Sequence, residues 1–180
     1  QTFGCMYLLI VSLRDWFIQE NDDKPGGINE AMNDVDRWIE LCDKQLHDDL
    51  KGAGVDQSLY SFRWLTLLCC MEFSLAELFK YWDYFFVEMN NMIILKATCV
   101  SIVLNLKAQL TGQNLQNCLN ILQNVPRLNQ DMVFDKAHTL LSKKLHYHVS
   151  NTRFVLPPAH VELMAPIEAA RTKVEGPPTA

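Results

Sequence analysis

Three histidines near the C-terminal end of the chain come closest to the spacing of a metal site. His146 and His148 are two residues apart, and His138 precedes them. A protein zinc site uses three or four nitrogen, sulfur or carboxylate ligands, and no cysteine or carboxylate joins these histidines at a suitable spacing. We therefore expect surface histidines, with no metal site and no cofactor.

Two acidic pairs, Asp22–Asp23 and Asp48–Asp49, could in principle divide the work of a general acid and a general base. Each pair stands beside a turn, where solvated helix ends are the commoner explanation. The sequence also lacks the nucleophile elbow, the zinc-protease helix, the phosphate loop and the dinucleotide-binding glycine pattern. We expect no catalytic residue within these 180 residues, and on that ground we expect that the chain is not an enzyme.

Three charged residues, Arg63, Glu72 and Asp83, are embedded in strongly apolar helical text. An uncompensated charge is costly to bury, so these side chains should pair with each other, cap helix ends or face a groove. A structural ion pair is favoured over direct contact with a partner. The aromatic residues around them have helical spacing, which favours packing in a core. They are Phe62, Trp64, Phe73, Phe79 and Trp82.

Helical periodicity dominates the elements that would position these residues, and no alternating strand pattern is present. One stripe of apolar residues predicts a single long helix that starts near residue 28 and continues past residue 42, with Ile28, Met32, Val35, Ile39, Cys42 and Leu46 on one face. The other expected helices are residues 2–19, 58–71, one that follows a Ser74–Glu77 capping box, 91–109, 115–126 and 131–144. We predict an all-α, multi-helix bundle.

Two of these helices carry specific expectations. The helix after the capping box should present one apolar face, formed by Leu75, Leu78, Phe79, Trp82, Phe85 and Phe86. Residues 91–109 are nearly continuously hydrophobic, and a helix that is apolar all round must be surrounded by protein. We therefore place this helix at the centre of the bundle.

Composition narrows the class of partner. The formal net charge is −5, which provides no basic face for nucleic acid or an anionic membrane. No apolar run reaches the roughly 20 residues that span a bilayer, so we expect no direct membrane insertion. The six cysteines include no Cys-x-x-Cys pair, which favours buried, reduced thiols in a cytoplasmic protein.

Three short motifs together resemble the second half of a TBC domain, the catalytic module of Rab GTPase-activating proteins. They are the aromatic–Arg–Trp helix at Tyr60–Leu65, the Glu–Phe ending at Met71–Phe73 and the Trp–Asp helix at Tyr81–Asp83. Weaker likenesses at Thr2–Cys5 and at Cys118–Pro126 extend the resemblance over about residues 1–144. It implies an all-helical domain with a GTP-bound Rab protein as its partner.

In the family that these motifs resemble, an arginine finger in Ile-x-x-Asp-x-x-Arg neutralises developing phosphoryl charge, and a glutamine finger in Tyr-x-Gln orients the attacking water. No Tyr-x-Gln occurs in this sequence. The one Asp-x-x-Arg, from Asp34 to Arg37, has Ala31 in place of the isoleucine and lies after the position where the finger belongs. The resemblance therefore covers the scaffold half, without either finger.

These observations predict a partial TBC domain over residues 1–145 and a proline-containing, disordered tail over 146–180. The chain begins within an apolar helical pattern, so we expect a piece of a longer protein, located in the cytoplasm or at vesicle surfaces through its Rab. The residues expected to order the GTPase groove are Arg63, Trp64, Glu72, Phe73, Trp82 and Asp83. The alternatives are a non-catalytic helical interaction scaffold and an unrelated helical bundle.

Overall fold

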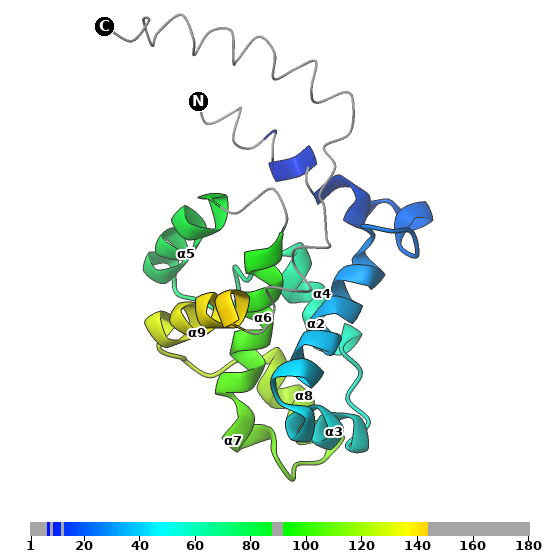
Figure 1. Ribbon diagram of the computed structural model, residues 1–180, viewed down its shortest axis with the longest axis vertical. Coiled ribbons are helices and arrows are strands. Elements are labelled where there is room, and N and C mark those ends of the chain that lie inside the picture. Colours follow the sequence, from blue (N-terminus) through cyan, green and yellow to red (C-terminus); the bar gives the residue numbers. More distant parts are fainter. Residues whose placement is uncertain (1–6, 8, 12, 88–91, 144–180) are drawn as a thin grey trace, which may run out of the picture.

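The computed structural model describes residues 7, 9–11, 13–87 and 92–143 (Figure 1). Every regular element within these ranges is helical, which confirms the predicted all-α class. The tail expected after residue 145, with His146 and His148, lies outside the described residues. The elements are η1 (Arg14–Phe17), η2 (Gln19–Asn21), α2 (Ile28–Cys42), α3 (Lys44–Gly52), α4 (Ser58–Thr66), α5 (Leu75–Val87), α6 (Ile93–Asn105), α7 (Lys107–Leu110), α8 (Leu115–Gln123) and α9 (Gln130–Lys143).

Helix α6 is the centre of the bundle, as its sequence predicts. Every residue from Ile93 to Val103 is buried, and α6 packs against α2, α4 and α9 (Figure 1). A buried hydrogen bond also joins α6 to α9: Ser101 Oγ donates to the carbonyl oxygen of Val133 at 2.7 Å. A helix with no polar face is stable only when its neighbours cover it on all sides.

The predicted continuous helix through Leu46 is wrong, because the chain breaks at Asp43. This residue leaves the helical region (φ −153°, ψ 84°), and its Oδ1 accepts a hydrogen bond from the N–H of Leu46 at 3.1 Å, which caps α3. The other carboxylate oxygen lies 2.6 Å from Lys107 Nζ, which ties the cap to α7. Leu46 is still fully buried, so the apolar spacing was correct although the helix was not continuous.

One charged residue lies inside the apolar helix α6. Lys96 is 6% exposed, and its Nζ lies 2.7 Å from Asp34 Oδ2 and 5.2 Å from the centre of the Trp38 ring. The ion pair and the cation–π contact together compensate the buried ammonium group and join α6 to α2. Asp34 also lies 3.5 Å from Arg37 within its own helix.

We expect Lys96→Met to lower the free energy of unfolding by about 2 kcal/mol, as measured by urea denaturation. The change leaves a largely buried carboxylate with only the more distant Arg37, and loss of one partner of a buried pair is costly. Lys44→Met is the matched control, because the Lys44 side chain is 70% exposed and its ion pairs should contribute at most about 1 kcal/mol. Equal effects of the two changes would contradict a structural role for the buried pair.

Candidate functional site

The three signature motifs lie where α4 ends and the chain turns into α5. α4 stops at Thr66, five residues before the predicted end at Met71. Leu68 and Cys69 follow with left-handed backbone (φ 52° and 54°), and the N–H of Cys69 bonds to the carbonyl of Trp64 at 2.9 Å. Two consecutive left-handed residues reverse the chain without glycine, a signal that sequence periodicity does not contain.

This reversal brings Glu72 beside Arg63. Arg63 Nη2 donates to Glu72 Oε1 at 2.6 Å, and the Glu72 side chain is 1% exposed while that of Arg63 is 38% exposed. The predicted structural ion pair between these two residues is therefore present. The remaining oxygen, Glu72 Oε2, and the Arg63 Nε are buried with no hydrogen-bond partner among the described residues.

Two aromatic residues of the signature, Trp64 and Phe73, pack against other aromatic rings. Trp64 is fully buried, with its ring centre 5.0 Å from that of Tyr60. Phe73 packs 5.6 Å from the ring of Tyr81 and 5.6 Å from that of Phe134 on α9. These contacts support the expectation that both residues are packing residues.

The Trp–Asp motif of α5 has a different environment. Trp82 is half-buried, its ring lies edge-on to Phe86 at 6.3 Å, and its indole N–H has no hydrogen-bond partner in the described part of the chain. Asp83 is exposed and forms no ion pair with any described residue, so it does not join the Arg63–Glu72 pair. Buried polar groups without partners are uncommon in native proteins, and each one requires an explanation.

The signature adjoins an open apolar groove that the sequence did not reveal. The groove has a volume of about 960 Å³ and is lined almost entirely by apolar atoms. Its walls come from the N-terminal segment, from the end of α4 and from α5, which are distant in the sequence. The main lining residues are Leu13, Phe17, Leu67, Cys70, Trp82 and Phe86.

Candidate nucleophiles near this groove are unreactive by environment. A hydrogen bond that the Cys69 thiol makes to Cys99, together with burial, raises the pKa of Cys69 well above its ordinary value. Burial and the nearby Glu72 charge raise the pKa of Cys70. The thiolate is the nucleophilic form, so both side chains stay protonated at neutral pH. The described cysteines are free thiols, of which Cys69, Cys99 and Cys118 are buried, as expected, whereas Cys42 and Cys70 are only partly buried.

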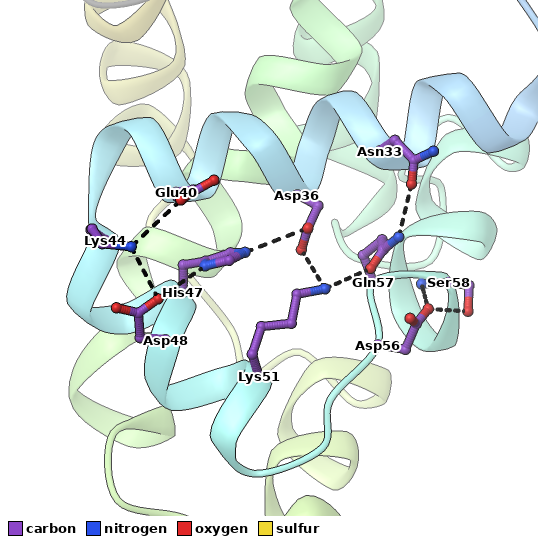
Figure 2. A network of polar contacts seen from close by, with 10 residues as sticks. All are labelled: Asn33, Asp36, Glu40, Lys44, His47, Asp48, Lys51, Asp56, Gln57 and Ser58. Atoms are coloured by element: carbon purple, nitrogen blue, oxygen red, sulfur yellow. Dashed lines mark hydrogen bonds and ion pairs between the residues drawn. The ribbon is translucent and has the colours of Figure 1, made fainter.

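A second polar cluster joins α2, α3 and the start of α4 (Figure 2). His47 lies between two carboxylates, 3.4 Å from Asp36 Oδ2 and 3.5 Å from Asp48 Oδ1, and Lys51 Nζ lies 3.1 Å from Asp36 Oδ1. Of the predicted acidic pairs, Asp48 thus belongs to this cluster. No group of three or more potential ligands that could hold a metal ion occurs among the described residues, which include His138. We assign this cluster a structural role, because its contacts hold α2, α3 and α4 together.

Asp56 in this cluster gives a prediction of pH dependence. Its Oδ1 accepts hydrogen bonds from Ser58 Oγ at 2.5 Å and from Ser58 N at 2.9 Å, and both bonds hold the pKa of Asp56 below its ordinary value of 3.8. A carboxyl whose pKa is lowered by folding stabilises the protein above its unfolded pKa. That contribution is lost as the pH falls through the folded pKa.

We therefore expect Ser58→Ala to raise the pKa of Asp56, as measured by NMR titration. The loss of stability relative to the unchanged protein should be present at pH 7 and should shrink below about pH 4. Thr66→Ala is the control, because Thr66 Oγ1 donates to the carbonyl of Phe62 and contacts no carboxylate. A stability loss in Ser58→Ala that does not change with pH would contradict this assignment.

The geometry describes a helical bundle with a signature ion pair beside an apolar groove, and comparison with known proteins identifies its class. The family model of the Rab-GTPase-TBC domain matches residues 1–111. The chain belongs to this family, and the resemblance of its motifs is confirmed.

Individual proteins similar to the chain carry names that fit this family. The chain is similar to TBC1 domain family member 13 of Homo sapiens and of Mus musculus, with 29% identity over 143 residues, covering 79% of this chain and 36% of each relative. It is 24% identical over 126 residues to GTPase-activating protein gyp1 of Schizosaccharomyces pombe, covering 69% of this chain and 24% of that protein. The chain thus spans about a third of the length of the first of these relatives.

The expectation that the chain is not an enzyme is wrong. It rested on the lack of a self-contained catalytic motif and of both finger motifs in the sequence, but proteins similar to the chain in both Schizosaccharomyces pombe and Saccharomyces cerevisiae are named GTPase-activating proteins. Acceleration of GTP hydrolysis is itself a catalytic activity, so absence of a self-contained nucleophile or metal motif was not a valid ground. Membrane insertion was not expected. Among the described residues, no helix is both long and apolar enough to cross a bilayer.

Proposed function

We propose that residues 1–145 form the C-terminal part of a TBC domain that accelerates GTP hydrolysis by a GTP-bound Rab-type GTPase. The observation that carries this proposal is the Arg63–Glu72 pair, which lies at the reversal between the aromatic–Arg–Trp helix and the Trp–Asp helix. Membership of the Rab-GTPase-TBC family supports the partner class.

We assign the six signature residues to one wall of the groove that receives the GTPase. Trp64 and Phe73 fix the helices by packing, and the Arg63–Glu72 pair holds the reversal between them. Asp83 is exposed and offers its carboxylate to a basic partner residue, and Trp82 is half-buried. This division predicts that Asp83 acts in binding, whereas the buried members act through the shape of the wall.

The two catalytic fingers are assigned to residues outside this 180-residue sequence. Tyr-x-Gln is absent from the sequence. The Asp-x-x-Arg at Asp34–Arg37 forms structural ion pairs, because Asp34 contacts both Lys96 and Arg37. The same absence favours the second candidate, a helical scaffold that keeps TBC packing and binds partners without catalysis.

Binding to a panel of purified Rab proteins, each loaded with GTP or GDP, tests the partner. We expect at least one Rab to bind with preference for the GTP form, and Asp83→Ala to weaken that binding. Asp131→Ala is the control, because Asp131 is an exposed carboxylate in the first turn of α9. No binding to any Rab would favour the scaffold.

Single-turnover GTP hydrolysis with the same panel tests the assignment of the fingers. An arginine finger contributes about 10³- to 10⁵-fold in rate, so the 180-residue chain alone should fall far short of that effect. Stimulation of about a thousandfold or more would show that a finger is present in this sequence.

A further inference from the structure

Residues with left-handed backbone stand on both sides of α5. Leu68 and Cys69 (φ 52° and 54°) precede this helix, and Met92 (φ 49°) follows it. In the described part of the chain these are the only residues other than glycine with positive φ. A side chain makes this conformation costly, so it persists only where surrounding contacts impose it, and such residues gather at ligand clamps and switch regions. Both connections of α5 to the bundle thus pass through strained backbone.

The bundle holds α5 from one side. Leu78, Tyr81 and Phe85 are at most 7% exposed, whereas Leu75 and Phe79 are 68% and 59% exposed. The helix lies at the edge of the bundle (Figure 1). The central helix α6 packs against α2, α4 and α9, so a displacement of α5 leaves these three helix pairs in place.

Contacts on the inner side hold α5 and the residues before it against α9. The Tyr81 ring stacks on that of Phe134 at 5.2 Å, and the Phe73 ring lies 5.6 Å from the same ring. Gln130 Nε2 donates a hydrogen bond to the carbonyl of Glu77. An isolated helix as short as the 13 residues of α5 is only marginally stable in water. Release of these contacts therefore exposes the backbone of α5 as a whole, not one turn at a time.

We propose that α5 is a hinged wall of the apolar groove, which opens and closes as one unit about Leu68, Cys69 and Met92 while the rest of the bundle stays folded. Trp82 and Phe86 are the part of the groove that α5 supplies, so opening removes that wall. A ligand held by these two side chains binds only the closed form, and its apparent affinity falls with the fraction of open chains. The opening holds whether or not the chain activates a GTPase.

Native-state hydrogen exchange of the full 180-residue chain tests the opening. We expect the amides of α5 to exchange through one shared opening, whose equilibrium constant exceeds that of the buried α6 amides by about a hundredfold or more. In low concentrations of urea, the α5 amides should share one dependence on urea, weaker than that of α6, because opening exposes less surface than global unfolding. Exchange of α5 only together with α6, or turn by turn from its ends, would overturn the proposal.

A pair of substitutions at Leu68 tests the hinge by the same exchange measurement. Leu68→Gly and Leu68→Ala both remove the buried side chain, but only glycine adopts left-handed backbone without a steric cost. Because opening releases that conformation, the opening constant of α5 should be about fivefold or more lower in Leu68→Gly than in Leu68→Ala. The same pair at Leu65, which is fully buried within α4, is the control, and there the glycine variant should be the less stable one. Equal opening constants in the two Leu68 variants would show that this residue is not a hinge and would overturn the proposal.

Discussion

Trp64→Ala is expected to lower the free energy of unfolding by about 4 kcal/mol, measured by urea denaturation. Trp64 is fully buried, and truncation of a buried aromatic residue leaves a cavity besides losing the burial itself. Its indole nitrogen has no hydrogen-bond partner among the described residues, so the loss should come from packing. Trp64→Phe should therefore lower the free energy of unfolding by less than half as much as Trp64→Ala does.

The same helix supplies the control for this change. Phe62 lies two residues earlier on α4 and is 48% exposed, so Phe62→Ala should cost no more than about 1 kcal/mol. Similar costs for the two substitutions would contradict the assignment of Trp64 to the core. They would also reopen the possibility that Trp64 contacts a partner.

Arg63→Met should lower the free energy of unfolding by about 3 kcal/mol, because it leaves the Glu72 carboxylate buried without its cation. The estimate is at the lower end for a buried pair, since Arg63 itself is 38% exposed and water screens part of its charge. Arg37→Met, which removes a more exposed arginine paired with Asp34, is the control and should cost less than about 1 kcal/mol.

The double substitution Arg63→Met with Glu72→Met separates an unpaired charge from lost packing. Replacement of both charges by apolar groups removes the desolvation cost, so most of the lost stability should return. A double variant that is as unstable as Arg63→Met would show that the arginine stem, and not the ion pair, holds the reversal.

Sequence periodicity predicted which residues are buried more accurately than it predicted where the helices end. The central position of α6 followed from its uniform apolarity, because no other arrangement covers such a helix. The break at Asp43 was missed since a capping aspartate inside an apolar repeat leaves the spacing intact. The early end of α4 was missed for a related reason: Leu68 and Cys69 are ordinary apolar residues, and nothing in their residue types predicts the left-handed backbone that they adopt.

The candidate site was only partly predictable. Arg63 and Glu72 were recognisable because charges in apolar text need compensation, and they do pair. The groove combines walls from three separate segments, so no local pattern in the sequence predicts it. The prediction that one apolar face of α5 is buried was wrong: Leu78 and Phe85 are buried, whereas Leu75, Phe79 and Phe86 are exposed. Periodicity does not reveal which of two adjacent helical rows has a covering neighbour.

The uniformly apolar surface of α6 has a consequence for biosynthesis. α9 covers part of α6, but it lies later in the chain, from Gln130 to Lys143. During translation α6 therefore emerges from the ribosome before its last covering helix, with an apolar flank exposed to solvent or to a chaperone. Any slowing of synthesis between residues 105 and 130 would lengthen that exposure, so aggregation of nascent chains should be decided within this interval.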